Sequence, residues 1–365
     1  MSSYIAGIGT AVPPHCASQA DLAEICKSFS CQTDDHERLL PVLYRRTGVK
    51  KRHSVVLKSN DGGLEGRQSF YGAANDAADR GPRTSQRMDV YNREACQLAV
   101  QASQNALHES RVSVAEITHL ITVSCSGFGA PGFDIGMIEE LGMSPQVART
   151  HVGFMGCHGA LNALRVARAF TQADPSACVL VCAVELCSLH QQYGWDPDQI
   201  VANALFADGA AAVVCMGATR QSVNCWKIEA TGSTVVPESQ DAMSWQIGDH
   251  GFTMTLSPRV PDLIQQQLRP WLDDWLASNR LSIKAVKSWA VHPGGPRILS
   301  AFGETAELER EALDVSYQTL ADYGNMSSPT VLFILRELRE AGAATPCVAL
   351  GFGPGLAIEA TLFSA

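Results

Sequence analysis

The sequence is poor in charge, and most of the charge it has is negative. Charged residues make up 18% of the chain, and 37 acidic side chains outnumber 28 basic ones, giving a formal net charge of −9. Proteins bind nucleic acids largely through Lys and Arg contacts to phosphates. The charge balance therefore argues against nucleic acid as the main partner.

Long apolar runs and metal-binding cysteine pairs are also missing. No stretch reaches the ~18 apolar residues that cross a bilayer, and the first residues, MSSYIAGIGTAVPP, lack the basic start of a secretory signal. No CxxC pair has zinc spacing, and the twelve cysteines are scattered through hydrophobic segments. We expect reduced core cysteines, no metal, no membrane partner and a cytoplasmic location.

Strand-like and helix-like runs alternate along the chain, which is typical of an α/β fold. Runs that predict strands cover 4–11, 119–126, 177–185, 210–217, 227–234, 288–293 and 347–353. Runs that predict helices cover 93–108, 157–171, 261–278, 305–321 and 327–341. The polar segment 58–90 is rich in Gly, Asp and Arg and predicts a long loop.

The order of these runs suggests an internal duplication. YIAGIGTAVP at 4–13 resembles KIEATGSTVVP at 227–237. Cys157 precedes the strand that starts near Cys178 by 21 residues, and Asn325 precedes the strand that starts near Cys347 by 22. We expect two similar halves, 1–222 and 223–365, with Cys157 in the first and Asn325 in the second, near a pseudo-twofold axis.

Three residues could act together in catalysis. Cys157 begins a helix-like run, where the helix dipole favours a thiolate. His292 ends a strand before Pro-Gly-Gly, and Asn325 precedes a long helix. Taken singly, a core cysteine, a loop histidine and a helix cap are the simpler interpretations. Taken together, the three make a thiolate nucleophile with hydrogen-bond donors beside it, which indicates acyl transfer.

Several further motifs resemble the type III polyketide synthases, the chalcone and stilbene synthase family of the thiolase superfamily. The resemblance runs from about residue 4 to 363, and it is carried by ALFADGAAAV (204–213), HPGGPRIL (292–299), YGNMSS (323–328), VLFILREL (331–338) and GFGPGL (351–356). It implies a thiolase-like five-layered αβαβα fold and a homodimer. It also implies that Cys157 is loaded from a starter acyl-CoA, with His292 and Asn325 completing the site. Repeated decarboxylative condensation with malonyl-CoA and cyclisation follow, with no cofactor.

The resemblance also assigns residues to the substrate cavity. Phe206 matches the family's gatekeeping phenylalanine, and Ser327 matches a cavity serine two residues after the asparagine. Met254 replaces a second gatekeeping phenylalanine. The loop that contains Gly351, Gly353 and Pro354 is expected to line or shape the same cavity.

Other cavity positions depart from the plant chalcone synthases. Cys125 and Cys187 stand where the plant enzymes have threonines, and Trp245 stands where they have a cavity glycine. Ala130 replaces the methionine that reaches across their dimer interface. This pattern is similar to bacterial members that make pyrones, resorcinols or naphthalenes, so we expect such a product rather than a chalcone.

The densest basic cluster is expected to meet the phosphates of CoA. It spans 45–52, and Arg46, Lys50 and Arg52 are its candidate contacts, the alternative being a solvated turn.

Two other functions remain open: a ketoacyl-ACP synthase III, which condenses once on a carrier protein, and a thiolase-fold protein that binds acyl chains without turnover. The HPGG and GFGPG motifs favour the polyketide synthase over the first, and the complete Cys-His-Asn trio argues against the second.

Overall fold

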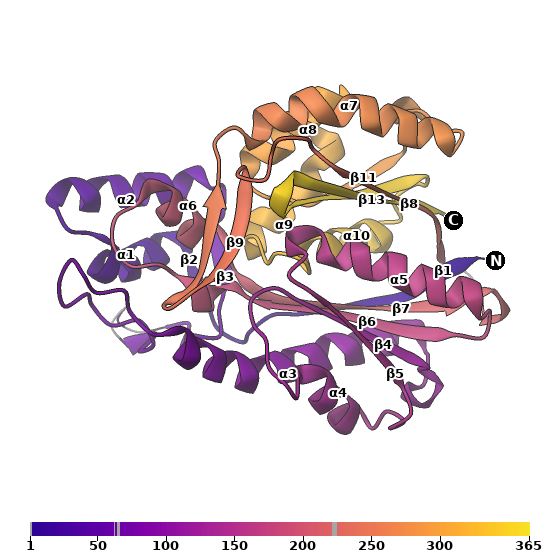
Figure 1. The fold of residues 1–365 in the computed structure, drawn as a ribbon, viewed down its shortest axis with the longest axis horizontal. Helices are drawn as coiled ribbons and strands as arrows, with labels where there is room; N and C mark the ends of the chain where they lie inside the picture. Colours follow the sequence, from indigo (N-terminus) through magenta and orange to yellow (C-terminus); the bar gives the residue numbers. More distant parts are fainter. Residues whose placement is uncertain (1, 62, 64–65, 221–224) are drawn as a thin grey trace.

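The protein is built from five alternating layers of helix and sheet (Figure 1). The computed structural model describes residues 2–61, 63, 66–220 and 225–365. One half-sheet contains β1 (Ser3–Ala11), β4 (His119–Ser124), β5 (Ala148–Gly153), β6 (Cys178–Leu186) and β7 (Asp208–Gly217). The other contains β8 (Trp226–Val235), β11 (Ser288–Val291), β12 (Cys347–Gly353) and β13 (Ala357–Ser364).

Helices cover both half-sheets on the outside and fill the space between them. The outer layers are α3 (Thr84–Ser110) with α4 (Phe133–Leu141), and α7 (Val260–Ser278) with α8 (Pro296–Ala306). The middle layer holds α5 (Gly159–Ala173) and α10 (Thr330–Glu340), which α9 (Asp314–Tyr323) precedes. These layers agree with the αβαβα arrangement expected from the sequence.

The two half-sheets meet at one edge. The strand order is β11-β12-β13-β8-β1-β7-β6-β4-β5, and β1 pairs with β8 only between Ser3–Ile5 and Trp226–Ile228. The two halves share an order of elements: a strand, a long outer helix, a strand, a second outer helix, a middle helix and two strands. The first half has one more strand, β5, before its middle helix, and the second half has α9 at that place. The boundary expected at 222/223 lies outside the described residues.

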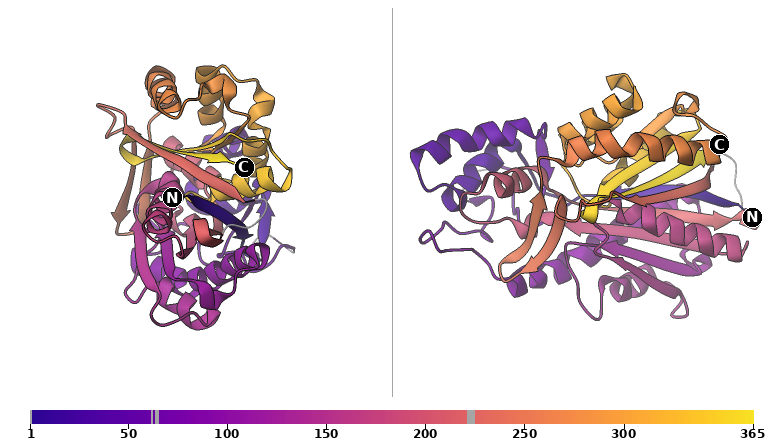
Figure 2. Two further views of the ribbon diagram at one scale, coloured as in Figure 1. Left: turned by 90° about the vertical axis from the view of Figure 1, so that its right-hand side faces the viewer. Right: turned by 45° about the horizontal axis from the view of Figure 1, so that its top comes forward.

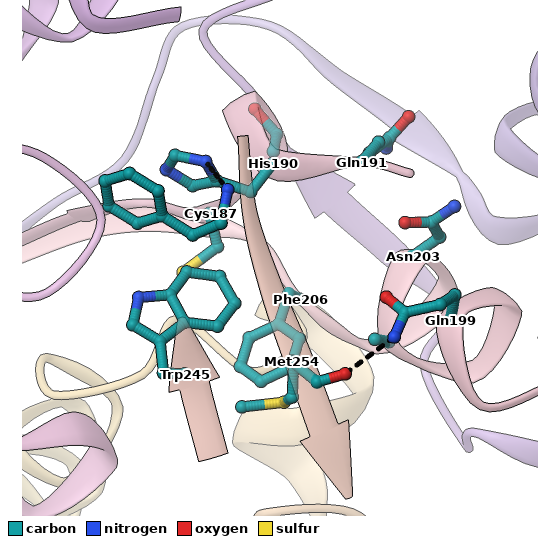
Figure 3. A pocket seen from close by; sticks show the side chains of 11 residues that line it. Cys187, His190, Gln191, Gln199, Asn203, Phe206, Trp245 and Met254 are labelled. Atoms are coloured by element: carbon teal, nitrogen blue, oxygen red, sulfur yellow. Dashed lines mark hydrogen bonds between the residues drawn. The ribbon is translucent and has the colours of Figure 1, made fainter. Parts of the chain in front are cut away.

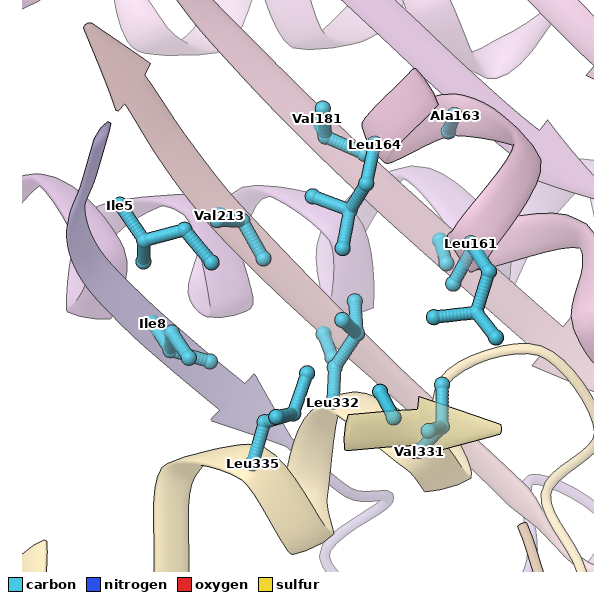
Figure 4. Close-up of a cluster of buried hydrophobic side chains, with 14 of the residues drawn as sticks. Ile5, Ile8, Leu161, Ala163, Leu164, Val181, Val213, Val331, Leu332 and Leu335 are labelled. Atoms are coloured by element: carbon cyan, nitrogen blue, oxygen red, sulfur yellow. The ribbon is translucent and has the colours of Figure 1, made fainter. Parts of the chain in front are cut away.

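The middle layer positions the residues expected to be catalytic. Leu161 and Leu164 of α5 share one buried apolar cluster with Val331, Leu332 and Leu335 of α10 (Figure 4). Burying such side chains is the main driving force for packing the layers together. Because Cys157 directly precedes α5 and Asn325 precedes α10, this packing brings their two turns to the same region of the molecule.

A group of smaller elements closes one end of the layers (Figure 2). It comprises helices α1 (Gln19–Ser30), α2 (Asp34–Arg46) and α6 (Pro197–Leu205), the hairpin of β9 (Met243–Gly248) and β10 (Gly251–Leu256), and the short pair β2 (Cys16–Ser18) and β3 (Lys51–His53). The strand and helix runs identified in the sequence include none of these elements. No helix in the described ranges is both long and apolar enough to span a bilayer.

Two local predictions are wrong. The helix expected over 305–321 is divided, because α8 ends at Ala306 and Glu307 takes a left-handed conformation with φ +54°. The loop expected over 58–90 ends earlier, because α3 begins at Thr84. The Gln86 side chain accepts a hydrogen bond from the Arg83 backbone N–H at 2.8 Å, which caps this helix and starts it within the polar segment.

Candidate active site

Cys157 lies in a tight turn between a sheet and the middle layer. A single turn of 3-10 helix, Gly156–His158, precedes α5, and Cys157 is only 5% exposed. Gly156 has φ +75°, and a Cβ atom there would lie 2.2 Å from Cδ of Pro354. Only glycine fits this turn, and its backbone therefore fixes where the thiol points.

Asn325 and Ser327 reach the same thiol from the other half of the molecule. The backbone of Asn325 bridges to the end of α6, with Asn325 N donating to Leu205 O and Ala207 N donating to Asn325 O, both at 2.9 Å. Hydrogen bonds with the side chains of Ser327 and Asn325 both act to lower the pKa of the Cys157 thiol. The structure thus brings Cys157 and Asn325 together, as the sequence predicts.

His292 lies immediately after β11 and near enough to His158, the neighbour of Cys157 in the chain, to interact with it electrostatically. It does not line the pocket over Cys157. Its backbone N–H donates to Leu350 O of β12 at 2.8 Å, and the residue is fully buried. Within the described chain, neither ring nitrogen has a hydrogen-bond partner. Burial, with a smaller electrostatic contribution from His158, lowers the pKa of His292 to about 3. The ring is therefore neutral near pH 7.

Burial, rather than the helix terminus, dominates the ionisation of Cys157. Loss of water raises the pKa of its thiol to about 12; the hydrogen bond with Ser327 opposes this shift, and the Glu185 carboxylate adds to it. Desolvation thus opposes the thiolate that the helix N-terminus is expected to favour. The resting site holds a neutral thiol and a neutral imidazole.

A pocket opens over Cys157 and collects most of the expected cavity residues. Its wall contains Cys125, Cys187, Phe206, Trp245, Met254, Ser327 and Pro354, and also Met243. The structure therefore places all but two of the substrate-binding candidates around the nucleophile. Two additional thiols lie beside a mainly apolar wall, which suits an uncharged acyl chain.

The two exceptions are Gly351 and Gly353. Neither lines the pocket. A Cβ at Gly353 would lie 2.4 Å from Cδ2 of His158, and one at Gly351 would lie 3.1 Å from Cβ of His158. The expectation that they line the cavity needs correction, because Gly353 makes room for the buried His158 ring and Gly351 for the Cβ of the same residue. That they help to shape the cavity stays a prediction.

Glu185 is a further residue in the pocket wall that the sequence analysis missed. It is fully buried and accepts hydrogen bonds from Ser126 Oγ at 2.7 Å and from Ser328 Oγ at 2.8 Å. The backbone N–H groups of Cys125 and Ser126 also donate to it, both at 2.9 Å. Burial raises its pKa. The only signal in the sequence is one acidic residue near the end of an otherwise apolar strand.

Trp245 and Met254 of the β9–β10 hairpin form part of a partition between this pocket and a second one. Figure 3 shows the residues that line the second pocket. Cys187, Phe206, Trp245 and Met254 line both pockets. On the far side the second pocket has a polar wall made of Ser188, His190, Gln191, Gln199 and Asn203. Trp245 Nε1 donates to Cys125 O at 2.7 Å, which holds the indole in the partition.

A larger cavity of about 320 Å³ lies between α2, α6, the start of α7 and the segment 294–298. It therefore begins two residues beyond His292. Arg46 lines this cavity, and its role in binding CoA phosphates stays a prediction; Arg297 lines the cavity as well. Arg297 leaves no signal in the sequence, because it stands alone and outside the basic cluster.

The other two CoA candidates lie elsewhere. Lys50 is exposed and does not line the cavity. Arg52 is only 3% exposed, and its Nη1 donates to Asn203 O at 2.7 Å and to Phe206 O at 2.6 Å. The expectation that Arg52 contacts CoA needs correction, because its side chain points inward and holds the segment that carries Phe206.

A buried cysteine that faces an asparagine across two packed halves, with a histidine nearby, defines an acyl-transfer enzyme of thiolase-like fold. Comparison with known proteins gives the narrower assignment. The family model for the N-terminal domain of chalcone and stilbene synthases matches residues 2–219, and the model for their C-terminal domain matches residues 227–365. The chain belongs to this family, the type III polyketide synthases.

Curated relatives and solved structures agree with this assignment. The chain is 31% identical to the alpha-pyrone synthesis polyketide synthase-like Pks18 of Mycobacterium tuberculosis, over 99% of this chain and 91% of that protein. It is 32% identical to the 1,3,6,8-tetrahydroxynaphthalene synthase of Streptomyces peucetius subsp. caesius, over 98% and 92%. The crystal structure of PKS-I from the brown alga Ectocarpus siliculosus superposes with a TM-score of 0.92 at 28% identity, covering 100% of this chain and 98% of that one.

These comparisons confirm the thiolase-like fold and the family predicted from the sequence. The protein is an acyltransferase that carries out decarboxylative condensation with malonyl-CoA, the reaction of its family. The comparisons do not support the single-condensation alternative on a carrier protein.

Proposed function

We propose that Cys157, His292 and Asn325 catalyse repeated condensation and that the product is a pyrone, a resorcinol or a related aromatic compound. The observation that carries this proposal is the Cys157 thiol, which contacts Asn325 and Ser327 at the base of a pocket walled by Cys125 and Cys187. The printed names of two relatives, one for alpha-pyrone synthesis and one for a tetrahydroxynaphthalene, support this product class.

In the loading step, His292 acts as the base. Its pKa of about 3 leaves a ring nitrogen free to accept the proton of the Cys157 thiol as the sulfur attacks the starter thioester. The C–S bond to CoA breaks, and the proton passes to the departing CoA sulfur. The net change is an acyl group moved from CoA to Cys157, and His292 returns to its neutral form.

In the condensation step, malonyl-CoA loses CO₂ and becomes an enolate. The Asn325 amide and the N–H group of the neutral His292 ring can donate hydrogen bonds to the developing oxyanion, and one such donor is typically worth about 10²–10³ in rate. The enolate carbon then attacks the Cys157 thioester, so that a C–C bond forms and the cysteine sulfur leaves as a thiolate. The lengthened chain, now on CoA, reloads Cys157 for the next cycle.

The 320 Å³ cavity is the proposed path for the CoA arm. It extends from Gly294 and Gly295, next to His292, to Arg46 on α2, and an exposed guanidinium there suits the phosphates. The proposed reaction uses acyl-CoA and malonyl-CoA as substrates and needs no cofactor. We also propose that the protein acts in the cytoplasm. The chain is proposed to divide into two halves, 1–222 and 223–365.

A homodimer is part of the proposal. Phe128, Phe154 and Met155 are 48%, 40% and 38% exposed, and the rings of Phe128 and Phe154 lie 6.4 Å apart. Phe128 stands two residues before Ala130, the position that the family resemblance assigns to the dimer interface, and β5 is the last strand of the sheet among the described residues. An apolar patch beside a free strand edge favours a second copy of the chain as its partner.

The proposed function is tested with purified protein, a panel of starter acyl-CoAs and malonyl-CoA, without any carrier protein. We expect products that contain more than one malonyl-derived unit, with masses of pyrones or alkylresorcinols. Cys157→Ala is the control for background chemistry. Products limited to one condensation, or formed only after a carrier protein is added, would overturn the proposal in favour of the ketoacyl-ACP synthase III alternative.

A further inference from the structure

We propose that a cavity behind Phe206 is a binding site for a small monovalent anion, the size of a halide or of a formate-like carboxylate, held by Arg52 and Gln191. This cavity is separate from the pocket over Cys157 and from the CoA path. It lies between α1, the segment 52–71 and the end of α6, and its wall includes Cys26, Arg52, Gln68, Gln191 and Phe206.

Arg52 brings an unused donor to this wall. Its Nε donates to Gln19 Oε1 at 3.1 Å, and its Nη1 donates to Asn203 O and Phe206 O. Its Nη2 is buried and has no hydrogen-bond partner of normal geometry among the described residues; the buried Tyr44 hydroxyl, which also lacks such a partner, lies near enough to interact with the guanidinium. A buried donor left unpaired costs free energy, and native structures rarely leave one in that state.

The charge of Arg52 is also uncompensated. No carboxylate of the described residues lies within 4.0 Å of its guanidinium, and none lines the cavity. The nearest ring contact is Tyr44, which is neutral, with its centroid 5.8 Å from the guanidinium carbon. Taking a cation out of water without a counter-charge is unfavourable, so the site favours an anion over water.

The other polar side chains of the cavity wall also leave a hydrogen-bond donor free to bind an anion. Gln191 is buried, and its Oε1 accepts a weak hydrogen bond from the Cys26 thiol, which leaves its side-chain NH₂ as the free group. The side chain of Gln68 is already used, since its amide bonds the backbone of Tyr71 in both directions at 2.8 Å. Two donors therefore remain, one of them charged.

The size of the cavity limits the ligand. It has a volume of about 20 Å³, which is room for one or two groups the size of water. A halide ion or a formate fits this space, whereas a phosphate or an acyl chain does not. Because the same guanidinium holds the carbonyl of Phe206, an anion on Nη2 would stiffen the segment that borders the Cys157 pocket.

The direct test is a crystal of the intact enzyme soaked in bromide. We expect an anomalous peak within hydrogen-bond distance of Arg52 Nη2. A parallel soak in formate tests whether a carboxylate occupies the same place. Density that fits water alone, with no anomalous signal beside Arg52, would overturn the proposal.

Solution measurements separate this site from other arginines. Thermal unfolding is followed in formate, bromide and gluconate at one ionic strength, gluconate being too large to enter. We expect formate or bromide to raise Tm, and Gln191→Leu and Arg52→Met to weaken apparent binding roughly tenfold or more. Arg46→Ala, which removes an exposed arginine from another cavity, is the matched control and should bind normally.

If Arg52→Met does not fold, Gln191→Leu and the bromide crystal still decide the question. An equal rise in Tm with gluconate, or an unchanged response in Gln191→Leu and in any folded Arg52 variant, would show a general salt effect and contradict the site. A rise in Tm with bromide but not with formate would identify the ligand as a halide. A rise with formate but not with bromide would identify it as a carboxylate.

Discussion

The side-chain oxygen of Asn325 accepts a hydrogen bond from the backbone N–H of Ser327 at 2.8 Å. This short loop fixes the amide, so that its NH₂ group is the part left for Cys157 and for substrate. It also holds Ser327 in a left-handed conformation, with φ +55°, beside the same thiol. A side chain oriented in this way can donate to an enolate oxygen without moving.

Replacing Asn325 by Asp should separate loading from condensation. The carboxylate can still accept from Ser327 N–H, but it cannot donate to the enolate and repels its charge. We expect malonyl-CoA decarboxylation to fall by about 10²–10³, while loading of Cys157 by a starter is largely retained. Release of ¹⁴CO₂ measures decarboxylation, and intact mass spectrometry measures loading of Cys157. A variant with normal decarboxylation would remove Asn325 from the proposed mechanism.

Cys157→Ala should abolish the acyl-enzyme. With a non-extendable acyl-CoA, intact mass spectrometry should show one acyl adduct on the wild type and none on this variant. Cys187→Ala is the matched control, because Cys187 is a second buried thiol of the same pocket. An adduct that survives in Cys157→Ala but disappears in Cys187→Ala would move the nucleophile to Cys187.

The pH dependence of loading follows from the two opposite pKa shifts. Burial raises the pKa of Cys157 to about 12 and lowers that of His292 to about 3, so both groups are neutral between these values. With a neutral base in place, the loading rate should be nearly flat from about pH 5 to 9.

His292→Gln supplies the contrast. Without the base the thiol must ionise alone, so loading should rise about tenfold per pH unit below a pKa near 12. Stopped-flow measurements of CoA release give both profiles. A wild-type profile that climbs in the same manner would show that His292 does not accept the thiol proton.

Trp245→Gly should join the pocket over Cys157 to the pocket behind the partition, since Trp245 lines both. We expect the variant to accept longer starters or to release longer polyketides, seen as a shift to higher product masses. Loss of an indole from a partly buried site should cost about 3–5 kcal/mol of unfolding free energy at most. An unchanged product spectrum in a folded variant would contradict the partition.

Gly353→Ala should disturb the site without touching substrate. The added Cβ would lie 2.4 Å from the His158 ring, so we expect a loss of about 1–3 kcal/mol in unfolding free energy. The double variant His158→Ala/Gly353→Ala should recover part of this loss, because the ring that causes the clash is gone. Denaturant unfolding measures all of these variants, and additive losses would argue against the contact.

The sequence predicts the fold because it depends on local patterns, and the same patterns single out three residues whose catalytic role stays a prediction. Alternating strand and helix runs give the layers, and Cys157, His292 and Asn325 lie in short motifs whose turns the backbone confirms. The divided helix at 305–321 was missed because Glu307, not a glycine, takes the left-handed turn.

Other features depend on packing between distant segments and leave little trace in the sequence. In the sequence, Arg52 belongs to a basic cluster that is expected on the surface. In the fold, its side chain points inward because it donates hydrogen bonds to carbonyl groups at the end of α6. The sequence predicts that Gly353 lines the cavity, but only the fold shows that it lies against the His158 ring. The pKa of Cys157 depends on how much water the folded chain removes, which a helix position alone does not determine.

The ring of Phe206 borders three separate cavities: the pocket over Cys157, the pocket beyond the partition and the cavity beside Arg52. A change in its size alters three volumes at once. Substitutions at Phe206 should therefore be non-additive with those at Trp245 on one side and Gln191 on the other. A change at Trp245 alters two of these volumes, whereas a change at Phe206 alters all three, so Phe206 is the position at which compensating mutations should accumulate.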